Sequence, residues 1–139
     1  MAAKQQRQPV PPGKPIKVQD LRPGTPGHNV VVKVVDSKQV LQRSRPDAPQ
    51  RAQMRLAECI VGDETGVIIF PARNEQVDVM QEGATVILNN AKVDMFRGSM
   101  RLAVDRWQGS IEVTEPASFS VKMDNNLSLI EFETILVDA

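Results

Sequence analysis

The 139-residue chain has few of the residues that build disulfides, metal centres and aromatic cores. It has one cysteine, one histidine and no tyrosine, and aromatic residues make up 4% of the sequence. A single cysteine excludes an internal disulfide and a cysteine-rich metal site, which suits a reducing compartment. Cys59 lies in an apolar stretch, where we expect an unreactive core thiol. His28 has no cysteine or histidine at metal-ligand spacing, so we expect a structural histidine.

Catalytic and membrane motifs are also missing. The sequence contains no serine–histidine arrangement and no glycine-rich phosphate loop. Asp63 and Glu64 belong to a turn, where an aspartate caps its own backbone. No apolar run is long enough for a signal peptide or a membrane span. We therefore expect a non-catalytic nuclear or cytoplasmic protein that needs no cofactor and no metal.

The chain has no excess of either charge, because 17 basic residues balance 17 acidic ones. The distribution is uneven, however. Residues 1–55 hold eleven Lys or Arg and three Asp or Glu, a balance of +8, so the remainder carries −8. This asymmetry indicates either a surface that binds a polyanion or two halves that neutralise each other.

Two turn signals lie at residues 62–66 and 96–99, each with strand-forming residues on both sides, which is the pattern of two hairpins. The expected strands cover residues 28–41, 54–61, 67–70, 84–96 and 99–107. Pro71 should limit pairing beyond the third strand, and residues 74–83 should hold a short helical turn. Five strands with a long first strand predict an all-β fold, a closed five-stranded OB-fold barrel.

Alternation along the strands predicts which side chains face the core. Ile68 and Phe70 share one face of the third strand, while Ile69, Pro71 and Arg73 share the other. The inward positions expected on the last two strands are Val86, Leu88, Met100, Leu102 and Val104.

The composition divides the chain into three parts. Residues 1–15 are rich in proline, glutamine and basic residues, which predicts a disordered basic tail. Residues 16–110 form the OB-fold domain, which begins with a lead-in segment that docks on the barrel. Residues 111–139 form a C-terminal extension with a strand-like pattern at 125–137. That apolar pattern needs a surface to cover, either its own barrel, a second copy or another protein.

Several motifs in this order are those of a known family. They are K-V-Q-D-L-R-P-G, a valine-rich strand, C-I-V-G-D-E-T-G-V-I-I-F, and M-F-R-G-S-M-R-L. Over roughly residues 16–107 the chain resembles the small eukaryotic single-stranded-DNA-binding proteins of the SOSS complex, the SOSS-B type. Its tail N-N-L-S-L-I-E-F-E resembles that of an uncharacterised plant branch of these OB-fold proteins. The resemblance implies a non-catalytic barrel that holds single-stranded nucleic acid in genome maintenance and DNA repair.

The resemblance also implies base-stacking aromatics on the outward face of the last three strands, and here the chain departs from the family. Arg73, Lys92 and Ala103 occupy three of the aromatic positions, and Phe96 alone remains. Each stacked base is worth about 1–3 kcal/mol. Arginine recovers part of this because its planar guanidinium stacks on bases and also contacts phosphate, whereas lysine offers a point charge. We therefore expect binding that depends on phosphate contacts and falls steeply with salt.

The predicted nucleic-acid-binding residues are cations and one aromatic in the long loop, the strands and the last hairpin. They are Arg43, Arg45, Arg51, Arg55, Arg73, Lys92, Phe96, Arg97 and Arg101. The loop arginines would follow the phosphate backbone, while Phe96 and Arg73 would stack on bases. The alternatives are simple solvation for the loop arginines and hairpin packing for Phe96. Met54 is either a core residue or a soft contact, and Trp107 either closes the barrel end or touches a ligand.

Two functions of different class remain open from the sequence. The first is a binder of single strands, with DNA favoured over RNA. The second is a protein–protein interaction or dimerisation module whose nucleic-acid affinity is weak or lost, with a partner held through residues 125–137.

Overall fold

The structure is a computed structural model that describes residues 15–43 and 54–132, the side chains of residues 41–43 excepted. The predicted disordered tail and the loop positions Arg45 and Arg51 lie outside the described residues, apart from residue 15 of the tail. The elements in chain order are η1 (Val18–Asp20), β2 (His28–Arg43), β3 (Met54–Asp63), β4 (Gly66–Arg73), α1 (Glu75–Val79), β5 (Thr85–Phe96), β6 (Ser99–Ala103), β7 (Ser110–Thr114) and η3 (Leu127–Leu129).

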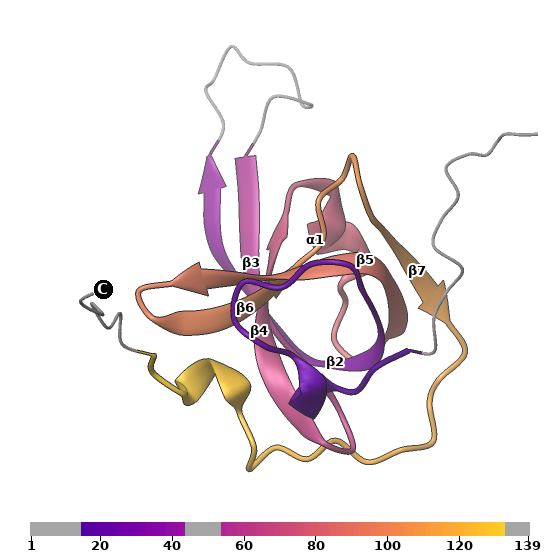
Figure 1. The fold of residues 1–139 in the computed structure, drawn as a ribbon. Coiled ribbons are helices and arrows are strands. Elements are labelled where there is room, and N and C mark those ends of the chain that lie inside the picture. The colour runs from indigo at the N-terminus through magenta and orange to yellow at the C-terminus, as the bar shows by residue number, and fades with distance from the viewer. Residues whose placement is uncertain (1–14, 44–53, 133–139) are drawn as a thin grey trace, which may run out of the picture.

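Five of the strands close into a ring in the order β2, β3, β4, β6 and β5, and β5 returns to β2. The predicted five-stranded OB-fold barrel is confirmed. β2 makes closure possible because it pairs with β5 through its first half and with β3 through its second. Lys33 sits at the change of partner, opposite both Gly62 and Thr85. The long β2–β3 ribbon and the β5–β6 hairpin project from the barrel in different directions (Figure 1).

Alternating side chains fill the barrel as the sequence predicts. Ile68 and Phe70 are fully buried on β4, and Val86 and Leu88 are fully buried on β5. Met100, Leu102 and Val104 are also buried. The lead-in segment docks as expected, because Val18 and Leu21 belong to the same apolar core.

Two expectations for the strands are wrong. β4 continues past Pro71 to Arg73, and Pro71 lies opposite Glu58 of β3. β4 and β6 pair only at Ile69 and Arg101, so beyond Ile69 β4 has a free edge, where a residue without an N–H is tolerated. The last hairpin strand, expected to reach residue 107, ends at Ala103 because a turn follows it.

The extra strand of the C-terminal extension lies earlier than expected. β7 pairs with β5 outside the ring, and residues 127–129, expected to be strand-like, form the 3-10 turn η3. In a 3-10 turn Leu127 points into the core while Leu129 remains 76% exposed. The division of the chain at residues 15 and 110 stays a prediction.

The described part of the extension lies on its own barrel, and its η3 turn contacts both β4 and β6 (Figure 1). The Ser128 hydroxyl donates to the Met100 carbonyl of β6 at 2.6 Å and accepts from the Ile69 N–H of β4 at 2.9 Å. Farther along, the Phe132 N–H donates to the Gly98 carbonyl at 2.8 Å. A Cβ at Gly98 would come within 2.8 Å of the Phe132 carbonyl oxygen, so a larger residue would disturb this contact.

Cys59 and His28 take the structural roles expected of them. Cys59 is fully buried, and burial raises the pKa of its thiol. The His28 ring lies 2.7 Å from the Thr25 hydroxyl, which itself donates to the Arg22 carbonyl. That hydroxyl proton is therefore used, so Nε2 of His28 is the donor to Thr25. Within residues 15–43 and 54–132, no cluster of three His, Cys, Asp or Glu side chains could hold a metal. No helix in the same ranges is long and apolar enough to cross a membrane.

Candidate nucleic-acid interface

The outer face of β5 and β6 carries a strip of mostly polar and charged side chains with one aromatic ring at its end. Lys92 lies opposite Ala103, Asp94 opposite Arg101, and Phe96 opposite Ser99. Alternate residues of a strand share a face, and each advances about 3.4 Å, so this strip is roughly 14 Å long. Phe96 at the hairpin tip marks one end of the strip, and Lys92 marks the other.

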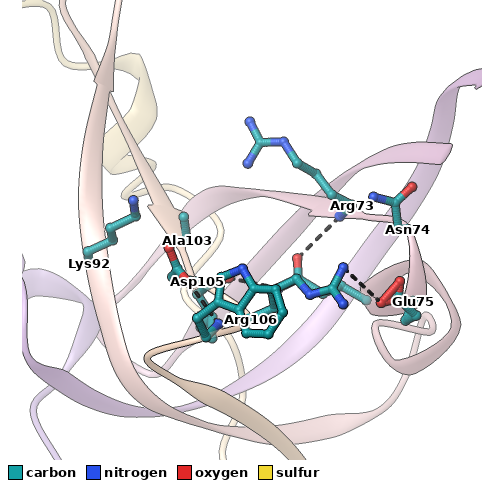
Figure 2. Close-up of a pocket in the computed structure, with 10 residues that line it drawn as sticks. Arg73, Asn74, Glu75, Lys92, Ala103, Asp105 and Arg106 are labelled. Carbon is teal, nitrogen blue, oxygen red and sulfur yellow. Dashed lines mark hydrogen bonds and ion pairs between the residues drawn. The ribbon is translucent and has the colours of Figure 1, made fainter. Parts of the chain in front are cut away.

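A cavity of about 250 Å³ lies at the Lys92 end, where β4, α1 and the segment after β6 meet. Its lining residues are Arg73, Asn74, Glu75, Gln76, Lys92, Ala103, Val104, Asp105, Arg106 and Trp107. Figure 2 shows Lys92 beside Ala103, and the guanidinium of Arg73 extending away from Glu75. Arg73, Lys92 and Ala103, which stand where the family has aromatics, all line this cavity.

The cations of the cavity are only weakly neutralised. Lys92 lies 3.7 Å from Asp94, and both side chains are nearly half exposed. Arg106 lies 3.8 Å from Glu75, and both are more than 60% exposed. Exposed pairs of this kind contribute about 0–1 kcal/mol. Arg73 has no ion-pair partner within the described ranges. The cavity can therefore offer these cations to an anionic ligand at little cost.

Backbone contacts fix the main chain of Arg73. Its N–H donates to the Gln76 side-chain carbonyl at 3.2 Å, and the Gln76 amide donates to the Val104 carbonyl at 2.8 Å. Gln76 thus joins the end of β4 to the segment after β6 across the cavity. The flexible guanidinium of Arg73 extends from a fixed base.

Phe96 lies at the exposed tip of the hairpin and has two cations against its ring. The residue is 49% exposed. The guanidinium carbons of Arg97 and Arg101 lie 5.2 and 4.6 Å from the ring centroid. Arg97 and Gly98 both have positive φ, which suits the tight turn that connects the strands. The tip therefore presents an aromatic surface and two cations together.

Arg101 lies between the hairpin tip and the neighbouring strands. One of its terminal nitrogens is 3.4 Å from a Glu58 carboxylate oxygen. Its Nε atom is buried without a hydrogen-bond partner in the described ranges. The carboxylate restrains this guanidinium, so Arg101 is less free than Arg73 to meet a ligand.

Arg55 is committed to contacts within the fold. It donates to both carboxylate oxygens of Asp78 at 2.9 and 2.8 Å, and to the Asn74 carbonyl at 3.0 Å. The hydrogen bond to Asp78 raises the pKa of Arg55, and the same bond lowers the pKa of Asp78. Arg55 holds α1 against β3 and could contact a ligand only by giving up these bonds. Arg43 is the last residue of β2, but its side chain is not among those that the structure describes. Arg45 and Arg51 lie outside the described residues altogether.

Trp107 does not close the barrel, because the residue is 81% exposed. Met54 is 56% exposed and so is not a core residue. Sequence reasoning did not single out Arg106, although a basic residue next to the chain's one tryptophan is a usable signal. The Arg106 guanidinium lies 4.7 Å from the Trp107 ring centroid.

Known proteins match the sequence of this barrel. Residues 21–113 match the family described as single-stranded DNA binding protein Ssb-like, OB fold. An uncharacterised protein of Arabidopsis thaliana is 52% identical over 128 residues, which cover 88% of this chain and 83% of that protein. The single-stranded DNA binding protein Ssb of Saccharolobus solfataricus is 29% identical over 86 residues, or 62% of this chain and 55% of that protein.

Solved structures show the same fold. The solution structure of a hypothetical Arabidopsis thaliana protein aligns with a TM-score of 0.74 at 47% identity, covering 100% of this chain and 97% of that one. A replication factor A related protein from Methanobacterium thermoautotrophicum aligns with a TM-score of 0.55 at 16% identity, covering 76% of this chain and 94% of that one. With the closed barrel and the sequence match over residues 21–113, this chain belongs to the Ssb-like family of OB-fold single-stranded-DNA-binding proteins.

Proposed function

We propose that this protein binds single-stranded DNA across the outer face of β4, β6 and β5, without catalysis, and that it also accepts RNA. The observation that carries the proposal is the cavity on that face, where the exposed cations Arg73 and Lys92 have weak or no ion-pair partners among the described residues. DNA is favoured because the Saccharolobus relative is named a single-stranded DNA binding protein.

Binding would combine phosphate contacts with base stacking along the strip. The forked donors of Arg73 and the ammonium of Lys92 would hold phosphates at the cavity, since arginine contacts phosphate through two parallel hydrogen bonds. At the other end, Phe96 would stack on a base while Arg97 and Arg101 supply positive charge beside it. None of these contacts reads a base edge, so we expect little sequence preference.

The finer assignment follows the sequence motifs. We propose that the protein is a nuclear member of the SOSS-B type and acts in genome maintenance, including DNA repair. The support is the D-E-T-G turn at residues 63–66 and the F-R-G turn at 96–98, in the same order as in that group.

Direct titration tests the proposed function. A fluorescently labelled single strand should bind more tightly than a duplex of the same sequence, as measured by anisotropy. With three to five phosphates contacted, the slope of log affinity against log salt should be about −2 to −3.5. Affinity should then fall roughly 20- to 100-fold between 50 and 200 mM salt. Equal affinity for duplex, or no binding at the lowest salt, would rule the function out.

The alternative, a protein–protein or dimerisation module, has one observation in its favour. Exposed apolar residues occur both on the β5–β6 hairpin and at the end of the described extension, and these two segments meet where the Phe132 N–H donates to the Gly98 carbonyl. These residues are Met95, Phe96, Leu129, Ile130 and Phe132, each at least 39% exposed. A second copy held through residues 125–137 would double the mass in solution from 15.4 kDa, which light scattering would detect.

A further inference from the structure

Trp107 is the most exposed large apolar residue in the described ranges, at 81%. Neither the barrel core nor the described part of the C-terminal extension covers it, and Arg106 contacts only part of its surface. Tryptophan is enriched at binding interfaces, where a partner covers the ring. The residues around it indicate which partner.

A defined turn fixes the backbone that carries this indole. The backbone N–H of Trp107 donates to the Asp105 carboxylate at 2.7 Å, and the Gly109 N–H donates to the Asp105 carbonyl at 2.8 Å. The Asn90 side-chain amide of β5 donates to the Gln108 carbonyl at 2.7 Å. A Cβ at Gly109 would meet the Asn89 carbonyl at 2.5 Å, so the turn packs directly on β5. The ring is thus presented by fixed backbone, which lowers the entropy lost on binding.

The cavity beside the ring has the lining that a stacked nucleotide needs. Trp107 shares it with Arg73, Lys92 and Ala103. Ala103 is small and leaves room where the family would place an aromatic ring. Arg73 and Lys92 supply positive charge for a phosphate, and the guanidinium of Arg106 lies 4.7 Å from the indole centroid. The carboxylate of Asp105, which also lines the cavity, accepts a hydrogen bond from the backbone N–H of Trp107.

We propose that Trp107 is a base-stacking residue of this site and replaces the aromatics missing at residues 73, 92 and 103. One base of a single strand stacks on the indole, and its adjoining phosphates contact Arg73 and Lys92. This inference rests on the proposed function, and it adds a contact outside the strands that carry the family's stacking positions. Three cations line the cavity against two carboxylates, Glu75 and Asp105, and this net positive charge favours a nucleotide over an apolar peptide as the occupant.

The composition of the chain allows a clean test. Because the protein has one tryptophan and no tyrosine, indole emission reports on Trp107 alone. Titration with an unlabelled oligothymidine should quench that emission. The dissociation constant fitted to the quenching curve should equal the one that anisotropy of a labelled oligothymidine gives.

Variants of Trp107 separate the loss of base stacking from general effects on the fold. Trp107→Ala should weaken oligothymidine binding about tenfold, while Trp107→Phe should retain most of the affinity. Val113→Ala is the matched control, because Val113 is an exposed apolar residue of nearby β7 at 62%, and it should bind as the unmodified chain does. Thermal unfolding should be unchanged in all three, since these side chains are exposed.

The outcomes are distinguishable. If labelled oligothymidine binds but indole emission does not change and Trp107→Ala binds equally well, the inference is wrong and the proposed function stands. The indole would then be free for a protein partner. If no oligonucleotide binds at low salt by anisotropy, the proposed function fails and the inference fails with it.

Discussion

Replacing Arg73 and Lys92 together with alanine is expected to lower the affinity for a single-stranded oligonucleotide about 100-fold at low salt. Each side chain would lose a charge-assisted contact to phosphate worth about 1.5 kcal/mol, and each 1.4 kcal/mol is a factor of ten in affinity. The salt slope should become shallower by about 1.4, because two fewer phosphates are neutralised. Anisotropy of a labelled strand at several salt concentrations measures both quantities.

A second double variant, Lys17→Ala with Lys122→Ala, provides the matched control. It removes the same net charge from side chains that are about half exposed. Both lysines lie by the β3–β4 turn. Lys17 pairs with Glu64 there, and the backbone N–H of Lys122 donates to the Asp63 carbonyl. That turn is at the opposite end of β4 from Arg73, roughly 23 Å away. We expect the control to change affinity less than threefold. Equal losses in both variants would show that net charge, and not the cavity, governs binding.

Asp63→Ala is expected to lower the free energy of unfolding by about 3 kcal/mol. The carboxylate is fully buried and joins two segments. One oxygen accepts from the Val18 N–H at 3.0 Å, and the other accepts from the N–H and hydroxyl of Thr65 at 2.8 and 2.6 Å. Alanine would leave these donors without partners, at about 1–3 kcal/mol for each buried group. Urea denaturation followed by circular dichroism measures the loss.

Two comparisons make the Asp63 result specific. Asp63→Asn keeps an acceptor oxygen and should lose less than the alanine variant. Asp124→Ala removes an acid from the nearby extension, where the side chain is 79% exposed, and should change stability by less than about 0.5 kcal/mol. A loss below about 1 kcal/mol for Asp63→Ala would mean that water replaces the carboxylate and that this turn is not a joint of the fold.

Most of the barrel could be predicted because the information is local. Strict alternation identifies Ile68 and Phe70 as core residues, and the two turn signals fix the hairpins. The extension is different, because η3 depends on Ser128 bonding to both β4 and β6. A hydroxyl that bridges two strands about 30 and 60 residues away leaves no periodic signal, so an apolar segment there resembles a strand.

The candidate site likewise has a part that the sequence predicts and a part that it does not. Arg73 could be placed on the outer face by alternation and Lys92 by the family resemblance, and both line the cavity. The commitment of Arg55 to Asp78 could not be predicted, because it depends on where α1 folds back against β3. The exposure of Trp107 likewise depends on Gly109 packing against β5. Isolated cations and aromatics can be recognised in the sequence, but whether they are free requires their tertiary neighbours.

The central claim is that the face around Arg73, Lys92 and Trp107 holds a single strand. Amide NMR spectra of the full chain during titration with oligothymidine test it most directly. We predict the largest shifts at residues 73–76, 92–97 and 103–108, with little change at the β3–β4 turn around residues 62–66. Shifts centred on that turn, or no shifts at an oligothymidine concentration that saturates anisotropy, would contradict the account.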